Sequence, residues 1–175
     1  YAGLPGDFEV TLPNSGNYAL VLSAGTSDVS FTNQVNTFSI GSNTLALGTV
    51  ITNTVMKPGD QWFYTFTGTV GQRLYYDALN ASYISMSVTL VLPHGVGLFS
   101  GNASSDRGPF TLTESGTYIL VFDGNGDTTG GISFQLLDLA AAPSVTIGST
   151  LNGSLTDPSQ TKMHRFTGTQ GQRVQ

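Results

Sequence analysis

The chain has 175 residues and a mass of 18.4 kDa, enough for one sizeable domain or two small ones. Charged residues make up only 10% of it, yet its 10 Phe and 7 Tyr within 39% hydrophobic content can bury a core, which a disordered chain cannot do. Six Lys and Arg against eleven Asp and Glu argue against a nucleic-acid partner, because such binding depends on neutralising phosphates. No apolar run approaches the ~18 residues of a membrane span, and the absence of cysteine excludes thiol or disulfide chemistry.

Alternating apolar residues predict strands through the middle of the chain. Every second residue of 62–66 is aromatic, and a connection containing two glycines leads to residues 72–77, which we predict as the second arm of a hairpin. Residues 84–92 alternate in the same way, so that one face is apolar. Pro93-His-Gly95 then ends the run, because proline lacks a backbone donor and glycine permits a turn.

Residues 118–122 are apolar at every position, which predicts a central strand. We expect residues 131–137 to be its partner across the turn Asp123-Gly-Asn-Gly-Asp127. No window combines helical spacing of apolar residues with a cap. Short strands separated by frequent turn signals therefore predict an all-β chain folded as an antiparallel β-sandwich.

The sequence repeats itself at a fixed offset of 100 residues. Residues 11–22 match 111–122 with 7 identities in 12, and residues 48–75 match 148–175 with 9 identities in 28 and no gap. Two separate blocks that share one offset predict a tandem array of units of roughly 100 residues.

This period predicts three parts in the chain. Residues 1–47 are the C-terminal part of a preceding repeat, residues 48–145 one complete β-sandwich repeat, and residues 146–175 the N-terminal part of a following repeat, so the chain is a window on a longer array. The two partial repeats together lack only the equivalents of 76–100, and each has open strand edges. We therefore expect the tail of one copy to pack with the head of a neighbouring copy by strand addition, a head-to-tail contact that builds a filament if it does not close.

Turn and core residues recur in five short motifs: Phe66-Thr-Gly68, Gly71-Gln-Arg-Leu-Tyr-Tyr-Asp77, Pro93-His-Gly95, Gly116-Thr-Tyr118 and Gly130-Gly-Ile-Ser-Phe134. This set resembles the bacterial pre-peptidase C-terminal domain family. The resemblance implies a jelly-roll-like β-sandwich that is secreted and carried beside enzymes or in tandem in large surface proteins. It also implies an extracellular or cell-surface location in a bacterium.

We predict that the protein is not an enzyme and requires no cofactor. The only bases near neutral pH are His94, which lies in a turn, and His164, which occupies the position of Tyr64 in the other copy. No nucleophile elbow, phosphate-binding loop or His-Glu-x-x-His motif occurs. The acidic residues are scattered, mostly in turns, so no carboxylate pair for glycoside cleavage is predicted.

The best metal candidate is the set Asp123, Asn125 and Asp127. Oxygen ligands at alternate positions suit Ca²⁺, and the intervening glycines let the chain wrap around an ion. The alternative is a turn in which the Asp and Asn side chains bond their own backbone.

The best candidate for glycan binding is an aromatic platform of Trp62 and Tyr75, with Tyr83 nearby and Arg73 and Asp77 as polar partners. The alternative is that these aromatic residues pack in the core or along a strand edge.

Taken together, these patterns favour a structural function: an extracellular tandem-repeat module that extends or assembles as a surface fibre or adhesin stalk, with neighbouring copies of the same protein as partners. The rival prediction is a carbohydrate- or protein-binding accessory module of a secreted enzyme.

Overall fold

The computed structural model describes residues 10–80, 83–156 and 159–175, and the chain divides into two compact units, Tyr1–Asn36 and Thr37–Gln175. In the first unit, the described residues form neither a helix nor a regular strand. Among these residues Tyr18 makes a local contact: its hydroxyl donates to the carbonyl of Asn14 at 2.6 Å and accepts from the Asn14 N–H at 3.3 Å.

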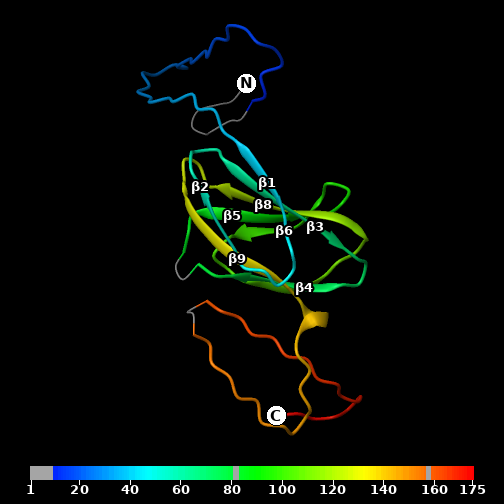
Figure 1. The fold of residues 1–175 in the computed structure, drawn as a ribbon. Coiled ribbons are helices and arrows are strands. Elements are labelled where there is room, and N and C mark those ends of the chain that lie inside the picture. The colour runs from blue at the N-terminus through cyan, green and yellow to red at the C-terminus, as the bar shows by residue number, and fades with distance from the viewer. Residues whose placement is uncertain (1–9, 81–82, 157–158) are drawn as a thin grey trace. The chain divides into compact units, whose positions relative to one another are not determined.

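The second unit contains two layered β-sheets (Figure 1). The five-stranded sheet has the order β1-β3-β8-β5-β6, with bounds Ile40–Thr44, Gln61–Gly68, Gly116–Gly124, Met86–Val91 and Gly97–Asn102. The four-stranded sheet has the order β2-β9-β4-β7, with bounds Ile51–Val55, Gly130–Asp138, Arg73–Ala78 and Arg107–Thr111. A short 3₁₀ turn, η1 (Leu139–Ala141), follows β9. The predicted all-β sandwich is confirmed, and no helix in the described residues has the length and hydrophobicity of a membrane span.

Strand β8 occupies the middle of the five-stranded sheet, as predicted for residues 118–122. It pairs antiparallel with β3 on one side and β5 on the other. Its inward side chains, including Tyr118 and Leu120, are fully buried, and its outward Ile119 and Val121 are half-buried. Because β3 and β5 lie on its two edges, their side chains partly cover the outward residues of β8, which explains why β8 is apolar at every position of 118–122.

Two predicted strand pairings are wrong. β9, which contains residues 131–137, pairs with β2 and β4 in the other sheet, and the turn after β8 carries the chain across the sandwich. In the same way β4 leaves the sheet of β3, so residues 72–77 do not form a hairpin with 62–66. Glycine-rich turns show where a chain reverses, but a reversal that crosses between sheets buries the same alternate residues as a hairpin does.

The core between the sheets is aromatic. Phe134 of β9 lies with its ring centroid 4.5 Å from that of Phe122, 5.2 Å from Tyr64 and 5.7 Å from Tyr76. All four rings are buried. Since they come from four strands of both sheets, these contacts hold the two layers together.

Tyr118 closes a tyrosine corner, a buried tyrosine whose hydroxyl bonds the backbone a few residues upstream. Its hydroxyl donates to the carbonyl of Glu114 at 2.8 Å. We expect Tyr118→Phe to lower the free energy of unfolding by about 1 kcal/mol, because it leaves that part-buried carbonyl without its donor. Urea denaturation measures the loss. Tyr18→Phe, at a side chain that is 52% exposed, is the control and should leave the unfolding of the sandwich unchanged.

Candidate functional site

The two histidines lie in different surroundings. Nδ1 of His94 is 2.5 Å from Oε1 of Glu114, in a turn on the surface. His164 is exposed in the segment that follows β9. Across residues 10–80, 83–156 and 159–175, no three His, Asp or Glu side chains gather closely enough to hold a metal ion.

The loop predicted to bind calcium connects the two sheets. Asp123 is half-buried at the end of β8, whereas Asn125 and Asp127 are exposed. The Asn125 N–H donates to the carbonyl of Ser85 at 3.0 Å, and Oγ1 of Thr128 donates to the carbonyl of Asn125 at 2.8 Å. These bonds shape the loop by protein groups alone, and Ca²⁺ binding there stays a prediction.

Burial raises the pKa of Asp123, and hydrogen bonds from Gln61 and the Gly124 backbone offset only part of the rise. When the pKa of a carboxyl is higher in the folded than in the unfolded state, the free energy of unfolding of the protein falls as the pH rises from the lower pKa to the higher one. We therefore expect Asp123→Asn to increase the free energy of unfolding at pH 7. This gain should vanish at a pH below the ordinary carboxyl pKa of about 3.9. Urea unfolding at pH 7 and at such an acidic pH measures the difference. A variant less stable than wild type at pH 7 would contradict this sign.

The four residues predicted as a glycan platform divide between the two sheets. Trp62 lies on β3, and its Nε1 donates to the carbonyl of Thr54 at 2.9 Å. Arg73, Tyr75 and Asp77 alternate along β4 in the other sheet. The structure thus brings the last three together on one strand without Trp62, and glycan binding stays a prediction.

Two acidic side chains, Asp77 on β4 and Asp106 just before β7, contact the segment that follows the sandwich. Asp77 is fully buried; its Oδ2 accepts from Nε2 of Gln135 at 2.6 Å and from the Thr161 N–H at 3.4 Å, while its Oδ1 has no partner in the described residues. Oδ2 of Asp106 accepts from the Tyr75 hydroxyl at 3.1 Å and from Oγ1 of Thr161 at 3.3 Å. Burial, together with Asp106, raises the pKa of Tyr75. Sequence patterns do not indicate Asp106 or Thr161, because Thr161 lies 55 positions from Asp106 and 84 from Asp77.

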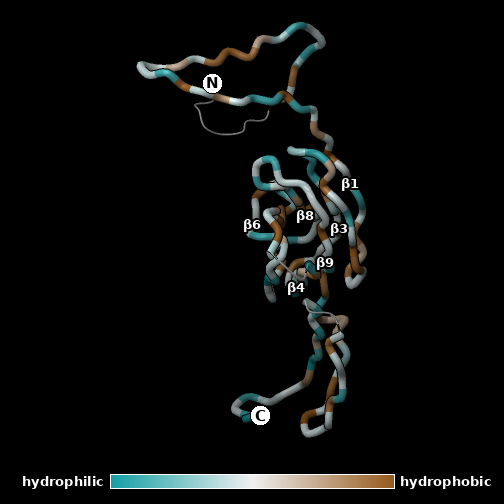
Figure 2. The backbone as a smooth tube through the Cα atoms, turned by 90° about the vertical axis from the view of Figure 1, so that its left-hand side faces the viewer, coloured by the Kyte–Doolittle hydropathy of each residue, from teal (hydrophilic) through white to brown (hydrophobic). Residues whose placement is uncertain are grey.

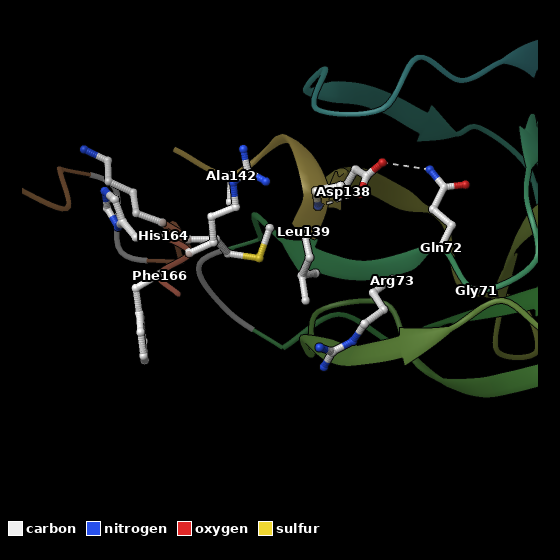
Figure 3. A pocket seen from close by; sticks show the side chains of 12 residues that line it. Gly71, Gln72, Arg73, Asp138, Leu139, Ala142, His164 and Phe166 are labelled. Carbon is white, nitrogen blue, oxygen red and sulfur yellow. Dashed lines mark hydrogen bonds between the residues drawn. The ribbon is translucent and has the colours of Figure 1, made fainter. Parts of the chain in front are cut away.

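An open hollow of about 700 Å³ lies next to this junction (Figure 3). It is lined by the start of β4, by η1 and by residues 162–166. Asp138 in its wall accepts from Nε2 of Gln72 at 2.8 Å, and the other charged side chains there, including Arg73, are basic. His164 also lies in the wall, and its ring makes no hydrogen bond with the part of the chain that the structure describes.

Hydrogen bonds of the sandwich recur at the 100-residue offset in both flanking segments. The corner at Tyr118 and Glu114 has its counterpart at Tyr18 and Asn14. Three further features recur between residues 143 and 172. The backbone bond from Leu45 N to Thr65 O (2.7 Å) recurs as the bond from Val145 N to Arg165 O (2.8 Å). The bond from Thr69 N to Gln72 Oε1 (3.1 Å) recurs as the bond from Thr169 N to Gln172 Oε1 (3.0 Å). Gly71 and Gly171 both have a φ of 82°.

The flanking segments expose side chains whose equivalents in the sandwich are buried. Tyr18, Leu20 and Phe166 are 52%, 47% and 54% exposed, whereas the residues at 118, 120 and 66 are at most 4% exposed. Hydrophobic positions recur along both segments (Figure 2). Both segments thus share local hydrogen bonds with the sandwich, and both leave apolar side chains about half exposed among the described residues.

Comparisons with known proteins reveal similarity of fold. No family model matches the sequence, and no curated protein matches it either. Among solved structures, the periplasmic inhibitor of g-type lysozyme PliG from Aeromonas hydrophila matches with 11% identity and a TM-score of 0.50, over 58% of this chain and 99% of its own. The pre-peptidase C-terminal domain of a collagenase from Bacillus anthracis matches with 19% identity and a TM-score of 0.44, over 60% of this chain and 99% of its own. The likeness to PliG shows that such a sandwich occurs in other proteins, and at this identity it shows no more than the fold.

Proposed function

We propose that the protein is a non-catalytic, extracellular β-sandwich repeat module, a structural unit of a bacterial surface fibre or adhesin stalk that assembles head to tail by strand complementation. One observation carries the proposal: hydrogen bonds of the complete sandwich recur at the 100-residue offset in two flanking segments that expose apolar side chains. In the first segment the recurring bond is that of the Tyr18 hydroxyl, and in the second it is a backbone bond at Val145. A strand with an open edge and an uncovered apolar face favours the addition of another strand.

Other features support parts of this proposal. The low charge and polar outer faces suit modules that stack without strong mutual repulsion. A secreted location agrees with that of PliG, a periplasmic protein that shares the fold.

The proposal is tested on the 175-residue chain by light scattering and electron microscopy as the protein concentration is raised. We expect assemblies that lengthen with concentration. Leu20→Asp should abolish them, because the equivalent Leu120 is fully buried in the complete sandwich. Val21→Asp is the matched control: Val21 is 82% exposed, its equivalent Val121 faces outward, and assembly should persist. A wild-type chain that stays monomeric at every concentration would overturn the proposal.

A second candidate is a binding module for a carbohydrate or a protein. It is favoured by the fold shared with PliG, described as a lysozyme inhibitor. Binding of the chain to immobilised glycans, lost in Tyr75→Ala, would support this alternative.

A further inference from the structure

We propose that the sandwich bears tensile load along the chain through a mechanical clamp, the parallel pair of the edge strand β1 with β3. Under tension the load enters the sandwich at Ile40 and leaves it at Asp138, and β1 can be withdrawn only by shearing it along β3. The inference rests on the proposed fibre or stalk function, in which modules joined in series carry load, and adds to it the strand pair that determines the unfolding force.

The load runs along the length of β1. Ile40, which starts β1, pairs with Gln61, which starts β3, and the two strands run in the same direction. The Gly48 N–H, just after β1, donates to the carbonyl of Leu136 near the end of β9 at 2.8 Å. The chain therefore enters β1 at one end of the sandwich and leaves β9 at the opposite end (Figure 1). A force applied between these two points acts along the strands.

Backbone hydrogen bonds hold β1 to β3 from end to end. The Gln61 N–H donates to the carbonyl of Ser39 at 2.9 Å just before β1, and the Leu45 N–H donates to the carbonyl of Thr65 at 2.7 Å just after it. The bonds of a parallel ladder are evenly spaced. A pull along the strand therefore strains all of them together, whereas a pull across a strand pair breaks its bonds one after another and needs less force.

Strand β1 is the element that such a load removes first. It lies at the edge of its sheet with β3 as its one neighbour among the described strands, whereas β9 lies between β2 and β4. Four of the five residues of β1 are exposed, so little side-chain burial opposes its removal. The β1–β3 ladder therefore sets the force at which the sandwich opens.

The same bonds recur where the next repeat begins. An isolated parallel bridge joins Ser144 and Arg165, and the Val145 N–H donates to the carbonyl of Arg165 at 2.8 Å. At the 100-residue offset this bridge is equivalent to the last pair of β1 and β3, Thr44 opposite Thr65. Because it follows shortly after β9 and η1, load that leaves one sandwich passes directly into the corresponding strand pair of the next repeat.

Pulling single molecules from different attachment points tests the clamp, and a chain without cysteine allows the handles to be placed at will. Handles at Thr37→Cys and Ala141→Cys load β1 along β3. Handles at Thr49→Cys and Ala141→Cys leave β1 outside the loaded path and separate β2 from β9 starting at one end. All three positions are exposed. We expect the first geometry to need at least about twice the unfolding force of the second at the same pulling speed, because forced unfolding is governed by the unfolding rate of the loaded element.

A pair of proline variants tests which bonds carry the load. Because Leu45 N and Ser39 O bond β3, the alternation of the ladder turns the Asn43 N–H toward β3 and the Ser42 N–H away from the sheet. Asn43→Pro should lower the force of the first geometry to that of the second and leave the second unchanged. Ser42→Pro is the matched control and should unfold like wild type, since proline is tolerated where an edge strand turns its N–H to solvent.

Equal forces in the two geometries would overturn the clamp, and so would an Asn43→Pro variant that keeps the wild-type force in the first geometry or weakens both geometries alike. These outcomes leave the head-to-tail assembly standing, because light scattering tests it separately. Chains that never assemble would refute the proposed function, whatever the force measurements show.

Discussion

Phe134→Ala is expected to lower the free energy of unfolding of the sandwich by about 3–5 kcal/mol. The ring is fully buried and contacts Phe122, Tyr64 and Tyr76, so its removal leaves a cavity lined by three aromatic rings from both sheets. A loss of this size is a large part of the ~5–15 kcal/mol by which domains are typically stable. Urea denaturation followed by circular dichroism measures it.

The matched control for this variant is Phe31→Ala. Phe31 belongs to the first compact unit and is 56% exposed. Truncating an exposed side chain typically changes stability by less than about 0.5 kcal/mol. If Phe134→Ala lowered stability no more than Phe31→Ala does, the aromatic cluster would not be what holds the two sheets together.

Local patterns in the sequence predict five of the nine strands of the described residues, namely β3, β4, β5, β8 and β9. The alternation from Met86 to Leu92 identifies β5 and its buried face, since Met86, Val88 and Leu90 are all buried. Apolar residues at every position of 118–122 indicate a strand with neighbours on both edges, as β8 has. Both patterns depend on which face of a strand is covered, and this is a property that periodicity records directly.

Local patterns do not identify which strands pair with one another. The turn after Asp123 was predicted to make β8 and β9 neighbours, but the chain crosses to the second sheet there. Alternation is the same in both arrangements, because each buries every second residue against the opposite layer. The contacts of Thr161 with Asp77 and Asp106 are equally invisible in the sequence, since they depend on where segments far apart in the chain are placed.

Internal repetition supplies information that local patterns lack. The match between residues 48–75 and 148–175 identifies equivalent positions, and the complete sandwich shows what surrounds each of them. Phe66 is buried and Phe166 is exposed, although the same Phe-Thr-Gly-Thr sequence begins at both. Phe66 lies on a strand that pairs with β8, whereas among the described residues the stretch around Phe166 has only an isolated bridge between Ser144 and Arg165.

The same substitution at two equivalent glycines should therefore affect stability differently, with a loss at one position and no change at the other. Gly68→Val is expected to destabilise the sandwich by about 3 kcal/mol, at the upper end of the cost of overpacking, because its side chain must displace Leu112 and Tyr118 from a filled core. Gly168→Val should leave the unfolding midpoint of the single chain unchanged, because open space surrounds that position apart from the end of Gln172. Thermal unfolding of both variants, at a concentration low enough to prevent association, measures the contrast. Equal destabilisation by the two variants would mean that residue 168 is already packed within its own chain, and the exposed face from which strand complementation is inferred would not exist.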